Sequence, residues 1–414
     1  MRNIYKNHTN QSLLAALLAL GVHTAAQAED SETASRFSLN GFGTLGMTRS
    51  SSNGAGFVRD LSQPHGSKGE WSANVDSLIG LQANWVLNDQ LAVIAQGVSR
   101  YHIGSSYDPE LMWGFVRYDP NGHSSFRLGR LATDFYMYAD SRHVGYTYLT
   151  VRPSADYFGV LPFAHIDGAD AQWVLPIGDL LLRTRLHGGW LNEKLPLADR
   201  SWNLQGSRML GGNVSLQSGA WTVRLSSSQL KFSHNLPIDE LTSGLKQTGM
   251  PSAVAAARAL DVADSTSRFD SLGAVYDEGP WQVQFMVSRA RHGSQSFQNW
   301  QSGYFLAGYR VGSLTPFAGY SWIRSKARSL STGLPGGAPF DELNAGVARV
   351  LADSHSDQHT TSLGLRWDFR ENMDLKIQFD AIRGKPGSVF PFRNESSNWN
   401  GRTNVLTMAM DFVF

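Results

Sequence analysis

The chain has 414 residues, no cysteine, and 36 basic against 35 acidic residues, which gives a formal net charge of +1. A near-neutral chain offers no electrostatic basis for binding nucleic acid. The lack of cysteine excludes disulfides, zinc-thiolate sites and cysteine nucleophiles. Beyond the N-terminal segment no stretch approaches 18 consecutive apolar residues, so we do not expect the chain to cross a membrane as helices.

The N-terminal segment has the features of a secretory leader. Arg2 and Lys6 precede an apolar stretch at 13–22, and Ala26 and Ala28 form a small-x-small cleavage pattern. This pattern predicts a signal peptide over 1–28, removed to leave a mature chain of 29–414. The alternative is an N-terminal membrane anchor, but the apolar stretch is shorter than the ~20 residues that span a bilayer as a helix.

Segments in which apolar and polar residues alternate recur through the rest of the chain, as strands with one apolar face require. In the segment around residue 365, for example, Leu363, Leu365 and Trp367 alternate with Gly364 and Arg366. Sixteen such segments begin near Phe37, Trp71, Gln90, Glu110, His123, Ala169, Leu180, Arg208, Ala220, Arg268, Trp281, Ser302, Leu314, Thr360, Met373 and Arg402. We therefore expect sixteen strands.

The connections between these segments are short and long in turn. Tight turns such as Asn88-Asp89 and Gly178-Asp179 use residue types that tolerate hairpin dihedrals. Short turns on one side and long loops on the other are typical of an outer-membrane barrel, with the short turns in the periplasm. The sequence thus predicts an all-β fold, a 16-stranded antiparallel transmembrane β-barrel with long extracellular loops. A soluble β-sandwich or propeller is the alternative, and it would need polar outer faces.

The last segment has an aromatic, apolar face made by Leu406, Met408, Met410, Phe412 and Phe414. One face toward lipid and one toward water would explain this alternation. A terminal aromatic strand resembles the C-terminal signal that the barrel-assembly machinery of Gram-negative bacteria recognises. The resemblance implies that Phe412 and Phe414 form the assembly signal.

Three groups of residues, in this order and spacing, resemble the general porins. They are the opening strand at 37–46, the run Arg127-Leu128-Gly129-Arg130 followed by 140–146 and 151–153, and the aromatic C-terminal strand. General porins are sixteen-stranded, trimeric, water-filled barrels. The resemblance implies a homotrimer in the outer-membrane lipid of a Gram-negative bacterium and passive diffusion of ions and small hydrophilic solutes.

The connection at 130–168 is far longer than usual, and such loops are normally functional or disordered. It is rich in aromatic residues, so we expect it to pack against a wall. In porins the third long loop folds into the lumen, and the resemblance implies a constriction loop here; an extracellular flap is the alternative. Long extracellular loops at 235–267 and 325–357 contain short helical patterns at 251–263 and 341–352.

The alternation of the strands and the composition of the third loop indicate which charged residues could line the channel. On the wall, inward-facing positions are occupied by Arg127, Arg183, Arg185, Arg224, Arg366 and Lys376. The constriction loop contributes Asp134, Asp140, Arg142, Arg152 and Asp156. We expect Arg183 and Arg185 to face the loop aspartates across the lumen, where opposed charges would create a transverse field. Each charge could instead form an ion pair that only holds the loop or wall together.

The mixed charges of the loop leave selectivity open, although the inward arginines favour anions slightly. A substrate-selective channel for small organic anions is therefore the second interpretation. We find no G-x-S-x-G motif and no His that pairs with a Ser and an acid. The sequence predicts no enzyme activity, no cofactor and no metal site, and an adhesin or an outer-membrane hydrolase is less favoured.

Overall fold

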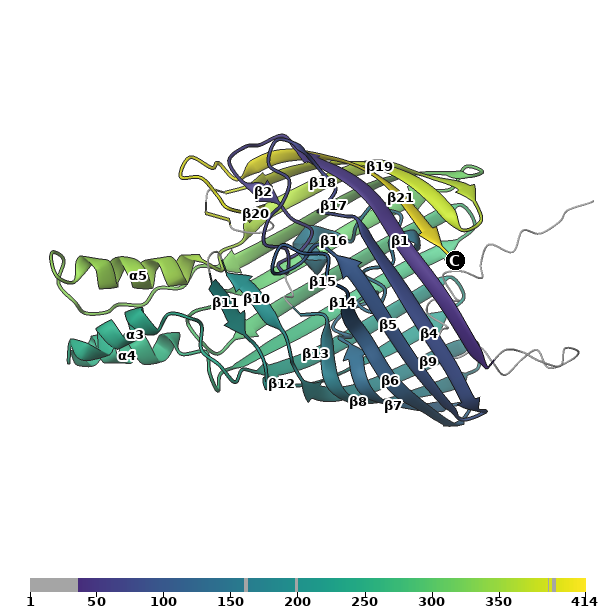
Figure 1. Ribbon diagram of the computed structural model, residues 1–414, viewed down its shortest axis with the longest axis horizontal. Coiled ribbons are helices and arrows are strands. Elements are labelled where there is room, and N and C mark those ends of the chain that lie inside the picture. Colours follow the sequence, from purple (N-terminus) through teal and green to yellow (C-terminus); the bar gives the residue numbers. More distant parts are fainter. Residues whose placement is uncertain (1–35, 160–162, 198–199, 386, 389–391) are drawn as a thin grey trace, which may run out of the picture.

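The computed structural model describes residues 36–159, 163–197, 200–385, 387–388 and 392–414. The predicted signal peptide, 1–28, lies outside the described residues. Long antiparallel strands form a closed barrel (Figure 1). The ring closes because β21 pairs with β1 from Ser50↔Val405 to Phe42↔Val413.

Sixteen strands make up this ring, as the sequence predicted. They are β1 (Phe37–Ser50), β4 (Leu78–Asn88), β5 (Leu91–Arg100), β6 (Glu110–Asn121), β7 (Ser124–Ala132), β8 (His165–Ile177), β9 (Leu180–Trp190), β12 (Arg208–Ser218), β13 (Trp221–Lys231), β14 (Thr266–Glu278), β15 (Trp281–His292), β16 (Asn299–Tyr309), β17 (Leu314–Lys326), β18 (Asp357–Arg370), β19 (Met373–Gly384) and β21 (Arg402–Val413).

Five shorter strands lie in the connections: β2 (Gly56–Phe57), β3 (Trp71–Ser72), β10 (Lys194–Leu197), β11 (Arg200–Asn203) and β20 (Phe392–Arg393). The expected start of the second barrel strand near Trp71 is wrong, because the strand begins at Leu78. A turn separates the two, in which the Ser77 N–H donates to the Ala73 carbonyl at 3.1 Å. This turn directs Asp76 into the barrel, where it is fully buried.

The outward face of the barrel is an apolar band. Large exposed side chains such as Leu128, Leu210 and Leu225 form this band. Aromatic residues beside the short turns border it at one end: Trp85, Tyr118, Trp221, Trp281 and Trp367. An apolar band with an aromatic girdle is the surface of a transmembrane barrel. Among the described residues, no helix is long and apolar enough to cross a membrane.

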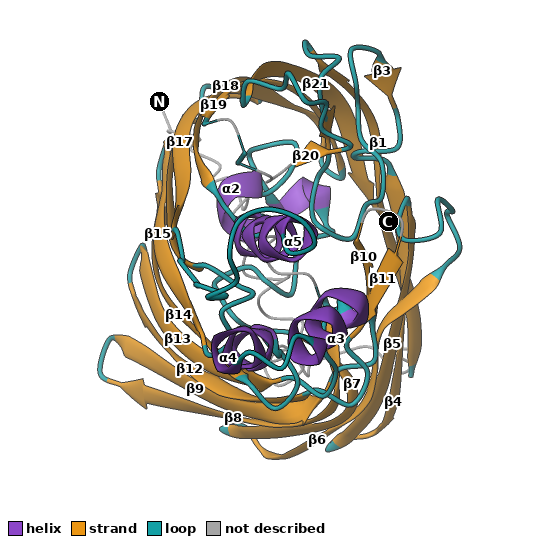
Figure 2. Cartoon of the chain, turned by 90° about the vertical axis from the view of Figure 1, so that its left-hand side faces the viewer, coloured by secondary structure: helices purple, strands orange, loops and turns teal. Residues whose placement is uncertain are grey.

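Within the part of the chain that the structure describes, helices lie in the long connections. α3 (Asp239–Gln247), α4 (Pro251–Leu260) and α5 (Asp341–Ala352) project beyond the strands at one end of the barrel (Figure 1). Leu245, Ala257 and Val347 are buried where these helices pack together. The sequence pattern indicated α4 and α5 but not α3. The third connection contains η1 (Gly145–Thr147) and α2 (Ala155–Phe158), and α2 lies inside the ring of strands (Figure 2).

At the seam between β1 and β21, aromatic rings lie over glycines. A Cβ atom on Gly43 would lie 2.4 Å from Phe412, and one on Gly41 would lie 2.2 Å from Phe414. The two rings are stacked on each other with centroids 6.4 Å apart. Since Gly41 and Gly43 leave room for these rings, the last strand can pack closely on the first.

We expect Gly43→Val to displace Phe412 and weaken the closure of the barrel. Overpacking of this kind costs about 1–3 kcal/mol. The measurement is the temperature at which the folded, SDS-resistant form is lost on electrophoresis. Ala83→Val is the control, because Ala83 also lies on the outward face but away from the seam. Equal loss temperatures for the two variants would contradict the seam packing.

Candidate functional site

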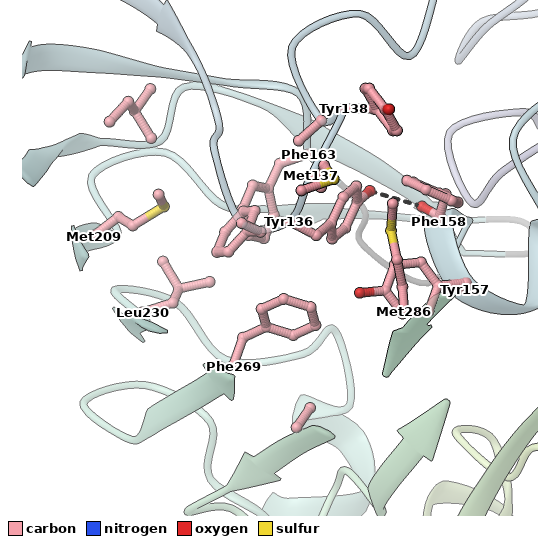
Figure 3. Close-up of a cluster of buried hydrophobic side chains, with 14 of the residues drawn as sticks. Tyr136, Met137, Tyr138, Tyr157, Phe158, Phe163, Met209, Leu230, Phe269 and Met286 are labelled. Atoms are coloured by element: carbon pink, nitrogen blue, oxygen red, sulfur yellow. Dashed lines mark hydrogen bonds between the residues drawn. The ribbon is translucent and has the colours of Figure 1, made fainter. Parts of the chain in front are cut away.

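Aromatic side chains of the third connection pack against β14 and β16 on the inner side of the barrel wall. Phe135 and Tyr136 contact Phe269 of β14 with ring centroids 5.5 and 6.0 Å away. Tyr157 of α2 lies 5.6 Å from Tyr304 of β16. Figure 3 shows Tyr136, Tyr157, Phe158 and Met286 packed together, with the Tyr136 hydroxyl donating to the Phe158 carbonyl at 3.1 Å. Burial of several large rings in one cluster stabilises the inward position of the connection.

Asp134 anchors the start of the connection to the neighbouring part of the wall, which β9, β12 and β13 form. Its carboxylate accepts from Arg185 of β9 at 2.8 Å and from Arg224 of β13 at 2.9 Å. The Asn213 side-chain amide of β12 donates to the same carboxylate at 2.8 Å. Three strands therefore converge on one loop carboxylate that is almost completely buried.

Arg152 anchors the second half of the connection. Its guanidinium donates to both carboxylate oxygens of Asp76, at 2.8 and 2.7 Å, and lies 3.2 Å from Asp380 of β19. Only 2% of the Arg152 side chain is exposed, and Asp76 is fully buried. The ion pair thus ties the third connection to the first connection and to β19.

Two wall bases hold η1 through its backbone carbonyls. Arg366 donates to the carbonyls of Tyr146 at 2.7 Å and Tyr148 at 2.9 Å. The Lys376 ammonium donates to the Gly145 carbonyl at 2.8 Å and to Asp411 at 2.8 Å. The Lys376 side chain has no exposed surface. These two bases therefore support the loop, and the Lys376 side chain does not reach the water of the lumen.

The remaining predicted loop residues lie apart from one another. Asp156 accepts from Ser321 of β17 and Gln358 of β18, both at 2.7 Å. The carbonyl of Arg142 accepts from Arg59 at 2.8 Å. Asp140 is half-buried, and within the described part of the chain no side chain donates to its carboxylate.

The first connection is also held by charge where it meets the third. Asp60 lies 3.8 Å from Arg100. Burial opposes ionisation of Asp60, but the positive charges of Arg100 and Arg142 outweigh it, so the pKa of Asp60 lies below its ordinary value. Asp60 is therefore a carboxylate at neutral pH and contributes to the contact between the two connections.

The expectation that Arg183 and Arg185 face the loop aspartates across the lumen is wrong in its geometry. Asp134 is in direct contact with Arg185, and Asp156 lies on the far side of the barrel against β17 and β18. The reason is that the connection runs around the inside of the wall, so its aspartates meet different strands. They do not form one acidic surface.

The inward face of the barrel has a covered part and a part that keeps contact with solvent. Inward side chains in the middle of β14, β15, β16 and β19 are buried. Inward side chains on β6, β7, β9 and β13 remain partly exposed: Arg117, Arg127, Arg183, Arg185 and Arg224. We call these five residues the arginine wall. Solvent inside the barrel therefore lies against a basic surface.

Few acids accompany the arginine wall. Arg127 donates to Asp170 at 2.9 Å, and Arg117 pairs with Asp119 at 2.9 Å. Arg183 donates to Gln217 at 3.3 Å. Between 14% and 22% of the side chains of Arg127, Arg185 and Arg224 is exposed. The guanidiniums of the arginine wall are thus held by hydrogen bonds or ion pairs while part of each measured side chain stays exposed to solvent.

Arg117 is the member of the arginine wall that the sequence analysis missed. Its neighbours Val116 and Tyr118 are exposed on the outward face. The same alternation that nominated the other wall arginines would have placed Arg117 inward.

Three Ser–His pairs occur among the described residues, and none of these has the geometry of a catalytic triad. They join Ser228 to His187 at 3.4 Å, Ser267 to His292 at 2.7 Å and Ser325 to His355 at 3.1 Å. A triad needs a carboxylate that orients the histidine. Within the described residues, none of these three histidines forms a hydrogen bond or ion pair with a carboxylate.

We expect Arg152→Gln to destabilise the protein strongly, because Asp76 and Asp380 would be left buried without their partner. Breaking a buried ion pair from one side costs about 3–5 kcal/mol. The measurement is the free energy of unfolding in guanidinium chloride, in detergent or liposomes. Arg183→Gln is the control, since its single hydrogen bond to Gln217 makes a small effect the expected result. Similar losses in both variants would show that the Arg152 network does not hold the loop.

Neither the protein-family models nor the curated proteins contain a match to this chain. Solved structures do match. The trimer form of OmpT, an outer membrane protein of Vibrio cholerae, has a TM-score of 0.52 and 14% identity, covering 91% of this chain and 99% of that chain. An anion-selective porin from Comamonas acidovorans has a TM-score of 0.51 and 13% identity, covering 91% and 99%.

A third match is the outer membrane channel DcaP of Acinetobacter baumannii, with a TM-score of 0.51 and 11% identity, covering 91% of this chain and 97% of that chain. At these identities the likeness concerns the fold. The closed ring of sixteen strands, the apolar outer band and these matches lead to one conclusion: this chain has the fold of the outer-membrane porins.

Proposed function

We propose that the protein is an outer-membrane porin through which ions and small hydrophilic solutes diffuse passively, with a preference for anions. The observation that carries the proposal is the arginine wall, a basic part of the inward face that keeps contact with solvent. A sixteen-stranded barrel encloses more space than side chains alone fill.

The preference for anions follows from charge. Four acids accompany the five guanidiniums of the arginine wall: Asp119, Asp134 and Asp170 pair with wall arginines, and the charge of Asp140 acts on Arg127 and Arg185, so one positive charge remains in excess. A basic surface inside a low-dielectric wall raises the local concentration of anions. The anion-selective porin from Comamonas acidovorans shares the fold and supports this proposal. Small organic anions are the solutes that the surface would favour most.

Passive diffusion without catalysis is part of the same proposal. It is supported by the geometry of the three Ser–His pairs, which lack an orienting carboxylate among the described residues. Hydrolysis of a lipid or peptide by the purified protein, lost on replacing one of these histidines, would contradict it.

The proposal includes a homotrimer in the outer membrane. The trimer form of OmpT shares the fold and supports it. The outward face of β5 carries the small residues Val93, Ala95, Gly97 and Ser99, which suit close contact between subunits. The proposal also includes export directed by the segment at 1–28 and insertion by the barrel-assembly machinery.

We expect the double variant Arg117→Gln, Arg183→Gln to shift the reversal potential of planar bilayers toward cation preference. A unit charge about 10 Å from a permeating ion in water contributes about 0.4 kcal/mol, or about a factor of two in permeability. Each lost charge disfavours chloride and favours potassium by that factor, so removing two charges should lower the chloride-to-potassium permeability ratio by up to about 16-fold in dilute salt. The shift should shrink as salt shortens the screening length from about 10 Å at 0.1 M.

The control for this experiment is Arg208→Gln, because Arg208 lies on the outward face of β12. It removes a positive charge without changing the lumen. If the wild-type protein forms no channel, the porin proposal fails. If the double variant keeps the wild-type ratio in dilute salt, the arginine wall does not set selectivity.

We expect Phe414→Ala to reduce the amount of folded protein in the outer membrane more than Phe305→Ala does. Both rings are exposed on the outward face, but only Phe414 lies at the seam with β1. Quantitative blotting of membrane fractions measures the difference. Equal yields would contradict the proposed role of Phe414 as an assembly signal.

A further inference from the structure

Three arginines gather on the outward face of β14 and β15, toward the ends that join the long connections. They are Arg268, Arg289 and Arg291, and their side chains are 46%, 54% and 51% exposed. The adjoining residues Phe269 and Ala290 are buried on the inward face. We call these three residues the outer arginine cluster.

All three guanidiniums converge on one carboxylate. Asp270 accepts from Arg268 at 3.0 Å, from Arg289 at 3.1 Å and from Arg291 at 3.2 Å. Each arginine uses one nitrogen for this contact, and no second acceptor for any of them occurs within the described residues. Since a guanidinium has five N–H donors, most donors of the cluster stay free and two positive charges stay uncompensated.

The register of the strands concentrates this charge. Arg268 lies directly opposite Arg291, and Asp270 lies directly opposite Arg289. Like charges directly opposite each other destabilise a sheet. The polar row continues from Arg289 to Gln301 of β16 and from Gln301 to Arg324 of β17. The cluster is therefore the centre of a polar surface that an anion would stabilise.

The height of the cluster places it near the edge of the apolar band. Arg289 lies eight positions along β15 from Trp281, which is beside the short turn. At ~3.3 Å per residue and ~40° of tilt this is roughly 20 Å of height, against a band of about 25 Å. Leu225, Leu272 and Phe285 lie exposed between the cluster and the short turns. Long arginine side chains at this level can extend their guanidiniums to the headgroups.

Carboxylates of a second molecule of this protein are less suitable ligands for the outer arginine cluster. Three outward acids toward this end of the barrel already have partners: Asp167 pairs with Arg130 at 2.7 Å, Asp264 with Lys231 at 3.0 Å, and Asp357 with Lys385. A phosphate group fits better, because guanidinium donors match its oxygens in pairs. The apolar side chains below the cluster would accommodate the acyl chains of the same molecule.

We propose that the outer arginine cluster binds the phosphate groups of a phosphorylated glycolipid of the lipid A type in the outer leaflet. The proposal rests on the outer-membrane location given under the proposed function. It assigns Arg268, Arg289 and Arg291 to the phosphate oxygens and Asp270 to holding the three guanidiniums together. The lipid would occupy the outward surface of β13, β14 and β15 and would not enter the lumen.

The test measures binding of fluorescent lipid A to the purified barrel in detergent. The triple variant Arg268→Gln, Arg289→Gln, Arg291→Gln should bind at least about tenfold more weakly than wild type, since each charge-assisted hydrogen bond contributes more than about 1.4 kcal/mol. The matched control is Arg49→Gln, Arg208→Gln, Arg402→Gln, which removes three outward arginines that do not converge. The control should bind as wild type does.

Two further measurements distinguish lipid phosphate from free phosphate and check that the barrel of the variant is intact. Dephosphorylated lipid A should bind weakly to the wild type, and inorganic phosphate should compete only in large excess. Conductance should be unchanged in the triple variant, because its residues lie outside the lumen, and the folded form on electrophoresis shows that the barrel is intact. Wild-type affinity in the triple variant, equal loss in the control, or inorganic phosphate binding as tightly as lipid A would each overturn the proposal. Absence of a channel with intact lipid binding would contradict only the porin proposal.

Discussion

The closure of β21 on β1 is the constraint on which the rest of this structure depends. In lipid every backbone N–H and C=O needs a partner within the protein, so a sheet can cross a membrane only as a ring without edges. The pairing from Ser50↔Val405 to Phe42↔Val413 removes the last edge. Once the ring is closed, alternation assigns each side chain either to lipid or to the interior. A slip of one residue would exchange the two faces.

The interior that closure creates is filled unevenly. The third connection packs its aromatic residues against β14, β15 and β16, where the inward wall offers Phe269, Met286 and Tyr304. Where the inward wall is polar, the same connection is held by charge, through Asp134 on one side and Arg152 on the other. The solvent-exposed part of the lumen is therefore displaced toward β6–β13 and the arginine wall.

Arginine has three different environments in this barrel, and depth and direction distinguish them. Arg152 is buried and fully paired, so it acts as a structural tie. The arginine wall faces the lumen with part of each side chain exposed. The outer arginine cluster faces lipid and is compensated only by Asp270. A guanidinium suits all three because it stays charged and offers several donors.

The sequence alone determined the strand count, the alternation of short and long connections and the inward direction of Arg127, Arg183, Arg185 and Arg224, because strand periodicity and turn chemistry are local properties. It missed α3, whose sequence has few apolar residues, and it set the start of the second strand too early. Only the tertiary structure decided which charges meet. Asp76 and Asp380 lie 76 and 228 positions from Arg152, and no local pattern encodes a contact at such a separation. Likewise, only the register of β14 and β15 brings Arg268 opposite Arg291, because pairing depends on how the whole ring closes.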